Sequence, residues 1–320
     1  MRRPDESEIL KYLHCPYCKG VVEKQESELA CSICNRSFHS FHDGFVMLRE
    51  ENELFPASAY IENAPNNKKR LRKPRIFAKV KSLVPSRSVN LARKRMFARL
   101  AIDHGEQNRT ILVVGCGNQA EQLNKYFPGS STTFIFCDID KRADAKIFCD
   151  AHELSFKDGI FDGVISTAVL EHVLYPDHVI AEINRVIKPG GFIYSEIPFL
   201  QSVHEGAYDF TRFTMSGHRR LCEKFDEIEA GMIAGPGTAL VWSITDFSRA
   251  LFSNARFSSF AALLSRTLFF WLKYFDYLCK DNPIALDAAS CTYFYGKKAV
   301  KRTSGKEIIE QYKGNVFRHA

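Results

Sequence analysis

In residues 111–117 the chain reads Ile-Leu-Val-Val-Gly-Cys-Gly, and this stretch decides the fold. The four apolar residues predict a fully buried parallel strand, and the glycines after it predict a tight turn where a ligand can approach the backbone. Residues 118–127 have helical composition, and Pro128-Gly129 stops the helix. Strand, glycine turn and helix together form the opening unit of a nucleotide-binding α/β sheet.

The overall composition is that of an ordinary globular protein, since 45% of the 320 residues are hydrophobic and 25% are charged. This length accommodates one α/β domain of about 200 residues and a small additional module. The longest uncharged run, residues 230–245, is shorter than the roughly 20 residues that cross a membrane. The N-terminus carries acidic residues and no apolar core, so we predict no signal peptide and a cytoplasmic location.

Four of the ten cysteines form a CxxC-x12-CxxC pattern, the spacing of two knuckles that hold one tetrahedral zinc ion. The alternatives are two CxxC pairs that occur by chance or a redox dithiol, but a redox motif needs only one such pair. Four thiolates leave no open coordination position, so the zinc is expected to be structural and to provide much of the folding energy of this small module. We predict a zinc ribbon over residues 9–50, with the ligands Cys15, Cys18, Cys31 and Cys34.

Residues 51–108 are predicted to form a basic, partly helical linker. Between Lys68 and Arg99 there are thirteen Lys or Arg and no Asp or Glu, with a candidate helix over residues 87–101. A positive tract of this kind can follow nucleic-acid phosphates or lie against an anionic membrane. A solvated helix face that leads into the main domain is an equally good interpretation.

A second strand over residues 132–137 is followed by Asp138. This residue comes twenty-one positions after Gly117, the distance at which an acidic side chain accepts hydrogen bonds from ribose hydroxyls. The pattern Gly115-x-Gly117-x-x-Ala120 also fits nicotinamide dinucleotides. The residues up to Asp138 therefore do not distinguish a nicotinamide enzyme from another adenosine-binding protein.

Four later motifs separate these alternatives. Residues 149–156 read CDAHELSF, 158–166 read DGIFDGVIS, 169–173 read VLEHV and 185–191 read RVIKPGG. In this order they resemble class I S-adenosylmethionine-dependent methyltransferases, most closely the type 11 branch, which also holds quinone-biosynthesis enzymes. The resemblance covers roughly residues 109–225, and the N-terminal module resembles zinc ribbons attached to methyltransferases and their activator subunits. It implies an α/β fold with a Rossmann-like, doubly wound, mostly parallel seven-stranded sheet over residues 109–300.

The same resemblance implies S-adenosylmethionine as the cofactor and assigns residues to it. The glycine turn packs against the methionine part, Asp138 holds the ribose, Asp150 accepts from the adenine amino group, and the Ala151 amide faces the ring. The cofactor-binding candidates are Gly115, Gly117, Asp138, Asp150, Ala151 and Thr167. The sequence departs from the family pattern at two points. Gln119-Ala120 replaces the usual third glycine, and only eleven residues separate Asp138 from Asp150, so the second crossover helix is expected to be very short or absent.

Two segments at the ends of the fourth and fifth strands provide acceptor-site candidates. Glu171-His172 is expected where the helix after the fourth strand begins, and His172 is either a general base or a structural residue. The loop after the fifth strand, residues 192–197, is dense in polar residues, as expected where substrates bind. Its acceptor-site candidates include Tyr208, and the catalytic candidates are His172, His204, Asp209 and Arg212. The alternative for Asp209 and Arg212 is a local ion pair that folds the loop, with a helix capped near Thr214.

An insert at about residues 238–282 separates the predicted sixth and seventh strands, residues 226–233 and 290–295. It carries an apolar stripe at helical spacing, formed by Phe260, Leu263, Leu264, Leu268, Trp271, Leu272 and Phe275. Such a stripe is usually core. The alternatives are a lid over an apolar acceptor, a dimer interface, or an interfacial membrane helix with Arg249, Arg256, Arg266 and Lys273 at the lipid headgroups. Residues 301–320 are expected to be a peripheral tail.

Together these observations predict a zinc ribbon joined to a methyltransferase. A small, lipid-like or glycan-type acceptor fits the aromatic insert and the family branch. A structured RNA, such as a ribosomal RNA base, fits the zinc ribbon and the basic linker. A non-catalytic methyltransferase-like scaffold is a third alternative, and the nicotinamide enzyme has no support beyond residue 138.

Overall fold

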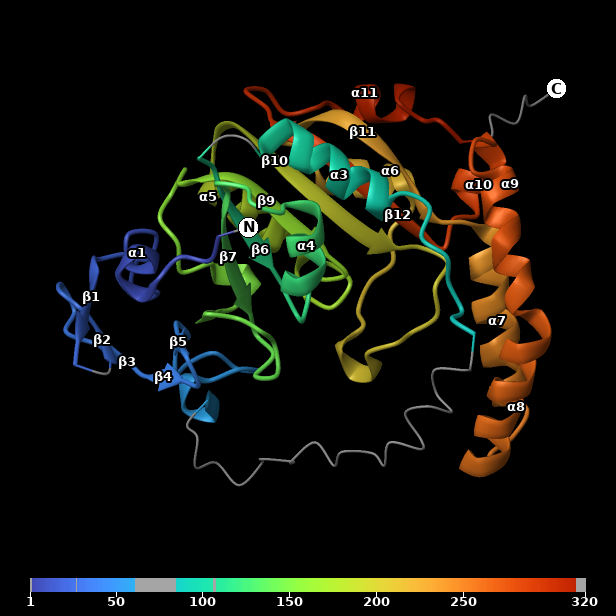
Figure 1. The fold of residues 1–320 in the computed structure, drawn as a ribbon, viewed down its shortest axis with the longest axis horizontal. Coiled ribbons are helices and arrows are strands. Elements are labelled where there is room, and N and C mark those ends of the chain that lie inside the picture. Colours follow the sequence, from blue (N-terminus) through green and yellow to red (C-terminus); the bar gives the residue numbers. More distant parts are fainter. Residues whose placement is uncertain (1, 27, 61–84, 106–107, 315–320) are drawn as a thin grey trace.

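A nine-stranded sheet organises the molecule, in the order β11-β12-β10-β9-β6-β7-β8-β5-β4 (Figure 1). The computed structural model describes residues 2–26, 28–60, 85–105 and 108–314. Strands β6 to β10 are parallel neighbours, while β12 pairs antiparallel with β10 and β11. The strands that follow the linker are β6 (Thr110–Val114), β7 (Thr133–Asp138), β8 (Ile147–Phe148), β9 (Phe161–Thr167), β10 (Ile187–Pro198), β11 (Phe225–Ala234) and β12 (Cys291–Lys298).

Both faces of this sheet are covered, because alternate residues of each buried strand point to opposite sides. In β6, Ile111 and Val113 share a core with α3 (Arg93–His104) and α4 (Ala120–Tyr126). Leu112 and Val114 share the other core with α5 (Pro176–Val186). Helix α6 (Met215–Leu221) follows β10 and is capped by Thr214, as predicted. The doubly wound sheet is therefore confirmed, and residues 139–146 between β7 and β8 contain no helix.

The N-terminal module extends this sheet. It begins with α1 (Glu6–Leu10) and a three-stranded sheet of β1 (Val22–Gln25), β2 (Glu28–Cys31) and β3 (Ser37–Phe38). Strands β4 (Ser40–Phe41) and β5 (Gly44–Val46) follow, and β5 pairs in parallel with β8. The main sheet thus has two strands beyond the seven predicted, because residues 40–46 join its edge. Leu13, Leu29 and Phe45 are buried in the same core as β6.

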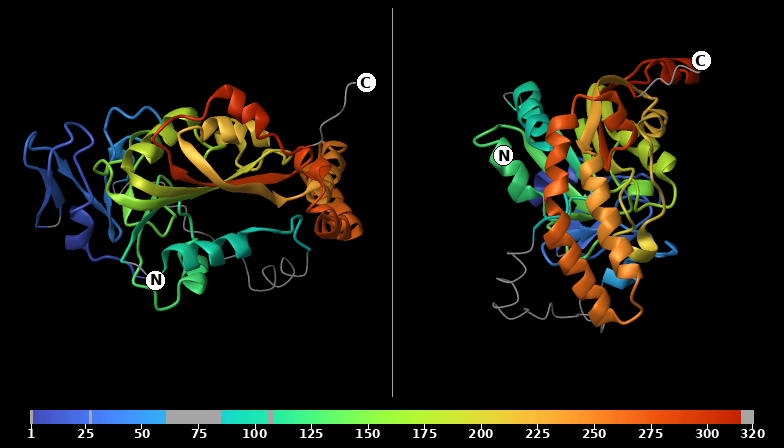
Figure 2. Two further views of the ribbon diagram at one scale, coloured as in Figure 1. Left: turned by 90° about the horizontal axis from the view of Figure 1, so that it is seen from above. Right: turned by 90° about the vertical axis from the view of Figure 1, so that its right-hand side faces the viewer.

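The insert forms a helical hairpin at the opposite end of the sheet (Figures 1 and 2). It comprises α7 (Pro236–Ala250), α8 (Ala255–Phe269), η4 (Phe270–Phe275), α9 (Asp276–Cys279) and α10 (Pro283–Asp287). The buried Asp276 carboxylate accepts hydrogen bonds from the backbone amides of Gly235 (3.0 Å), Gly237 (2.7 Å) and Thr238 (3.1 Å) at the start of α7. A buried carboxylate suits this position because the first amides of a helix lack intrahelical partners.

The apolar stripe of the insert is not core, so this prediction was wrong. Phe260 is 63% exposed and Trp271 is 48% exposed, and Ser265 is the residue of α8 that is buried. Helix α8 packs on α7, and the described residues place no further layer over its outer side. Two of the cations expected at lipid headgroups point inward instead. Arg266 donates to the Pro85 carbonyl (2.8 Å), and the buried Lys273 donates to that of Ser86 (2.6 Å).

Two helices begin at residues other than those predicted from the sequence. Helix α5 begins only at Pro176, so Glu171-His172 lies in the preceding loop and not at a helix start. Proline suits the first helical position because its fixed φ and missing amide hydrogen cost nothing there. The predicted linker helix is α3, which begins at Arg93, and residues 61–84 and 106–107 of the linker lie outside the described residues. The short elements η1 (Ala57–Tyr60), η2 (Ala151–Glu153), η3 (Gly206–Tyr208) and α11 (Gly305–Glu310) complete the described chain.

Candidate functional site

The glycine turn after β6 is shaped for close approach of a ligand. Gly115 and Gly117 have φ of +63° and +48°, a region that residues with a side chain rarely adopt. A Cβ at Gly115 would lie 2.2 Å from the Val169 side chain, whereas a Cβ at Gly117 would meet no atom within 4 Å. The turn therefore presents bare backbone and free space at the carboxyl end of β6, where ligands bind in open α/β sheets.

Asp138 stands beside this turn at the end of β7. Its carboxylate accepts hydrogen bonds from the backbone amides of Gly117 (2.7 Å) and Asp140 (2.8 Å). Burial raises the pKa of Asp138, and the amide hydrogen bonds oppose that shift. A carboxylate has about four acceptor positions, so the two oxygens retain capacity for the hydroxyls of a ribose.

Asp150 lies at the end of β8, just before Ala151 opens η2. One carboxylate oxygen accepts from the His152 amide (2.9 Å) and ring Nδ1 (2.7 Å), and the other accepts from the Asn52 side-chain amide (2.8 Å). Burial acts to raise the pKa of Asp150, but these hydrogen bonds outweigh it, and the pKa lies below its usual range. With about three of four acceptor positions filled, the carboxylate has room for one more donor.

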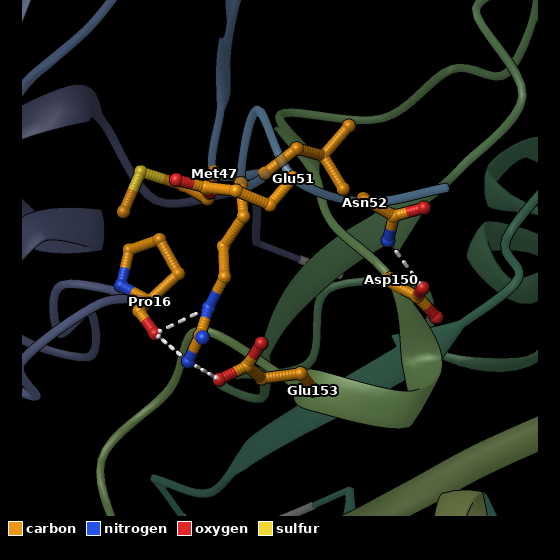
Figure 3. Close-up of a pocket in the computed structure, with 8 residues that line it drawn as sticks. Pro16, Met47, Glu51, Asn52, Asp150 and Glu153 are labelled. Carbon is orange, nitrogen blue, oxygen red and sulfur yellow. Dashed lines mark hydrogen bonds and ion pairs between the residues drawn. The ribbon is translucent and has the colours of Figure 1, made fainter. Parts of the chain in front are cut away.

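A cavity of about 250 Å³ adjoins Asp150, and the N-terminal module forms much of its wall (Figure 3). Arg49 donates to the Pro16 carbonyl (2.6 Å) and forms an ion pair with Glu153 in η2. Pro16 lies inside the first cysteine knuckle, so Arg49 connects that knuckle to the Asp150 site. Sequence reasoning missed Asn52 and Arg49, because only the pairing of β5 with β8 brings residues 47–52 here.

Thr167, the last cofactor-binding candidate, is linked to the glycine turn through Gln119. The Thr167 hydroxyl donates to the Gln119 side-chain oxygen (3.0 Å), and the Gln119 amide nitrogen lies 3.4 Å from the Gly115 carbonyl oxygen. The residue that replaces the family's third glycine thus ties the turn to the end of β9. Gly115, Gly117, Asp138, Asp150, Ala151 and Thr167 all lie at the carboxyl ends of strands that are neighbours in the sheet.

The acceptor side of the site brings two predicted histidines together. Nε2 of His172, in the loop after β9, lies 3.1 Å from Nε2 of His204, in the loop after β10. Beside them lies Glu171, whose side chain is fully buried and has no hydrogen-bond partner for either oxygen among the described residues. Burial raises the pKa of Glu171 to about 7 and lowers that of His172. Glu171 belongs to the VLEHV motif, but the sequence did not indicate that its carboxylate is buried without a partner.

The two histidines are held in place by contacts with Tyr208, Asp209 and Arg212. The side chain of Asp209 is buried, forms an ion pair with Arg212, and accepts a hydrogen bond from the His204 amide (2.9 Å). Burial acts to raise the pKa of Asp209, but the Arg212 guanidinium holds it well below its usual range. The Tyr208 carbonyl lies 2.8 Å from His172 Nδ1. The structure therefore contains the local ion pair that was the alternative for Asp209 and Arg212, and it places both residues around the loop that carries His204.

The cysteine knuckles converge as their spacing predicts. The sulfur pairs Cys15–Cys34 and Cys18–Cys31 are 3.6 and 3.4 Å apart, and all four sulfurs lie within 4.8 Å of one another. Zn–S bonds of about 2.3 Å in a tetrahedron would separate the sulfurs by about 3.8 Å, so the donor set fits a structural zinc ion. The two knuckles are equivalent, since the Lys19 amide bonds to the Cys15 carbonyl and the Asn35 amide to that of Cys31, each from a left-handed residue.

Part of the chain matches the model of a known protein family. Residues 112–195 match the model of the type 11 methyltransferase family, described as a methyltransferase domain. None of the curated proteins matches the chain in sequence.

Three solved structures illustrate the similarity in fold. One is the complex of the Haloferax volcanii Trm112 methyltransferase activator and a methyltransferase, with 18% identity over 63% of this chain and 89% of that chain and a TM-score of 0.40. Another is Haemonchus contortus phosphoethanolamine N-methyltransferase 2 with S-adenosyl-L-methionine. It has 16% identity over 65% of this chain and 53% of that chain, and a TM-score of 0.40. This chain thus spans about half the length of that enzyme. The third is the O-methyltransferase of a Brevibacillus brevis polyketide synthase with S-adenosyl-L-homocysteine. It has 14% identity over 69% of this chain and 76% of that chain, and a TM-score of 0.44.

The family match covers β6 to β10, the strands that carry the glycine turn and the acidic residues beside it. The bare backbone at Gly117 and the remaining acceptor capacity of Asp138 and Asp150 fit the amino-acid, ribose and adenine parts of the family's cofactor. The chain therefore contains an S-adenosylmethionine-dependent methyltransferase domain, preceded by an N-terminal module whose four cysteines are compatible with a structural zinc ion.

Proposed function

We propose that this methyltransferase acts on a small, lipid-like or glycan-type acceptor that it meets at a membrane surface. The observation that carries this proposal is the contact between the helical insert and the acceptor loop. The ring of Trp242 in α7 lies edge-on to the ring of His204, with 6.3 Å between the ring centroids. The insert therefore forms a wall beside the two histidines.

The outer side of the insert supports the same acceptor class. Exposed apolar side chains follow α7 and α8 and include Phe247, Phe252, Phe257, Phe260, Leu264 and Leu268. An exposed apolar face of this extent is typical of an interaction site on a protein or membrane. Among the described residues no helix is both long and apolar enough to cross a membrane. Contact at the interface, with the apolar side chains among the lipid headgroups, is therefore the proposed mode.

The chain's own residues bind, orient and accept a proton in the proposed reaction. When bound, S-adenosylmethionine supplies an electrophilic methyl group on a sulfonium. The glycine turn, Asp138 and Asp150 hold the two ends of the cofactor, and such positioning provides most of the rate enhancement in a direct displacement. Burial lowers the pKa of His172 and so favours the neutral imidazole, which can take a proton from an acceptor hydroxyl when no cation occupies its free nitrogen.

The RNA alternative has less support in the part of the chain that the structure describes. Of the five basic residues between 85 and 99, Arg87, Arg93, Arg95 and Arg99 form ion pairs with Asp246, Glu196, Glu229 or Asp103. Cations already paired with carboxylates have little charge left for phosphates. The remaining basic residues of the tract, 68–81, lie outside the described residues.

Transfer of a labelled methyl group tests the proposal. The full chain is incubated with methyl-labelled S-adenosylmethionine and either a membrane lipid and glycolipid extract or total RNA. We expect label in the organic extract, none in RNA, and none with Asp138→Ala. Label in RNA that is lost at raised salt would overturn the lipid-like acceptor and favour the RNA alternative.

A further inference from the structure

Glu171, His172 and His204 bring three potential metal ligands to one point on the acceptor side of the site. One nitrogen from each imidazole and one carboxylate oxygen all lie within 4.8 Å of one another. Nε2 of His172 is 3.6 Å and Nε2 of His204 is 3.9 Å from Glu171 Oε1. Metal–ligand bonds of about 2.1 Å separate neighbouring ligands by about 3.0 Å in an octahedron and about 3.4 Å in a tetrahedron. The observed spacings of 3.1 to 3.9 Å approach these values.

The hydrogen bonds of the two imidazoles determine which nitrogens carry lone pairs. Nδ1 of His172 lies 2.8 Å from the Tyr208 carbonyl oxygen, and Nδ1 of His204 lies 3.3 Å from that of Ser202. A carbonyl only accepts, so each Nδ1 is the donor. In a neutral imidazole the other nitrogen, Nε2, then has no hydrogen. With both imidazoles neutral, the two Nε2 atoms face each other at 3.1 Å with their lone pairs.

The carboxylate beside them increases this mismatch. Glu171 is fully buried, and neither of its oxygens has a hydrogen-bond partner among the described residues. An isolated buried carboxylate is unfavourable unless a charge or donors compensate it. Three lone-pair donors that converge in this way repel one another, and a cation between them would turn each repulsion into a bond.

Further groups hold the histidines in the orientation that a metal requires. Asp209 Oδ2 lies 3.4 Å from His204 Nδ1, and the Tyr208 carbonyl fixes the His172 ring. Metal-binding histidines typically donate their second ring nitrogen to a carboxylate or a carbonyl in this way. Asp209 and Arg212 are thus positioning residues for His204.

We propose that Glu171, His172 and His204 bind a divalent transition-metal cation whose open coordination positions receive an oxygen of the methyl acceptor. Two imidazoles and one carboxylate suit Mn²⁺, Fe²⁺, Co²⁺ or Zn²⁺, and three protein ligands leave positions for water or substrate. A coordinated hydroxyl loses its proton more readily, which favours methylation on oxygen. This last step rests on the proposed function, whereas cation binding does not.

The full chain, loaded with a single equivalent of zinc to fill the cysteine site only, is titrated with Mn²⁺ to test the proposed site. Binding is monitored by the loss of the electron paramagnetic resonance signal of free Mn²⁺. Thiolates are poor ligands for Mn²⁺, so the cysteine site does not interfere. We expect one bound equivalent per wild-type chain and at least tenfold weaker binding in Glu171→Gln and His204→Gln. His178→Gln, a change of an exposed histidine on α5, is the matched control and should bind as the wild type does. Enhanced water-proton relaxation by the bound Mn²⁺ is expected, because open positions hold exchangeable water.

Three results would overturn the proposal: no Mn²⁺ or Co²⁺ bound beyond the cysteine site, equal binding by the Glu171 and His204 variants, or bound Mn²⁺ without exchangeable water. S-adenosylhomocysteine binding, measured on every variant, shows that each variant is folded. It also separates the two proposals. A wild type that binds Mn²⁺ but transfers no methyl group would refute the proposed function and leave the cation site standing.

Discussion

The N-terminal module and the helical insert are attached to opposite ends of one sheet, and they are attached in different ways (Figures 1 and 2). The module adds strands β4 and β5 to the sheet and shares its apolar core. The insert follows β11 directly and is held by polar contacts such as those of Arg266 and Lys273 with the carbonyls of Pro85 and Ser86, and it leaves much of its apolar surface exposed.

Both attachments nevertheless reach the site with side chains of their own. Asn52 donates to Asp150 on the cofactor side, and Trp242 contacts His204 on the acceptor side. The module is therefore built into the sheet beside the proposed cofactor site, while the insert presents an exposed apolar surface. The four changes that follow test this division.

Removal of the zinc ion should have the largest effect. We expect Cys34→Ser to lose the metal and to lower the free energy of unfolding by about 3 kcal/mol or more, roughly 6–12 °C in Tm, because the module shares the sheet's core. S-adenosylhomocysteine should also bind more weakly, because Arg49 connects the first knuckle to η2. Zinc content and thermal unfolding measure this, with Cys279→Ser in α9 as the control. An unchanged melting curve in a zinc-free variant would show that the module does not contribute to the stability of the main sheet.

Asp138→Ala tests the proposed cofactor site, which lies on the sheet between the module and the insert. Loss of hydrogen bonds to a charged group costs about 1.5–3 kcal/mol, so S-adenosylhomocysteine affinity should fall roughly 10- to 100-fold. Calorimetric titration measures this, and NADH serves as the control ligand. Wild-type affinity in this variant would remove Asp138 from the cofactor site.

The double change Phe257→Ser and Phe260→Ser tests the insert. Both side chains are more than 60% exposed, at 62% and 63%, so the free energy of unfolding should stay within about 0.5 kcal/mol of the wild type. Each apolar side chain buried in a membrane contributes about 1.5–3 kcal/mol, so co-sedimentation with anionic lipid vesicles should fall at least about tenfold. A marked loss of stability with unchanged vesicle binding would mean that this face packs against protein.

Asn52→Ala should have the smallest effect and sharpens the comparison most. It removes one hydrogen bond to Asp150, worth about 1 kcal/mol, so S-adenosylhomocysteine should bind about fivefold more weakly. Asn124→Ala, an exposed change on α4, is the matched control. If the two variants bind equally well, the N-terminal module does not contribute to the cofactor site through Asn52.

The parts of the site that follow from local sequence were predictable, and those that depend on distant pairing were not. The turn at Gly115 and Gly117 follows from a buried strand and its glycines, and Asp138 follows from its distance along the chain. Asn52 reaches Asp150 across 98 positions, and no local pattern encodes that contact. The unpartnered burial of Glu171 depends in the same way on the loops of two strands.

The insert shows a different limit of sequence reasoning. Periodicity identified its apolar stripe correctly, but it does not say what covers that stripe. A helix with an apolar face has the same pattern whether the face meets a core, a partner or a lipid surface. The interpretation as core was wrong because α8 forms the outermost layer of the described structure at this end of the sheet.

The parallel pairing of β5 with β8 also constrains how this chain folds during synthesis. The ion pair between Asp43 and Lys146 closes a loop of 103 positions, and Phe45 pairs with Ile147 across a similar interval. The zinc knuckles and β5 are synthesised long before β8. The edge of β5 that pairs with β8 therefore stays unpaired while about a hundred further residues are made. Early zinc capture would hold that edge in a fixed place for β8, and the metal would then act as a guide to folding order as well as a source of stability.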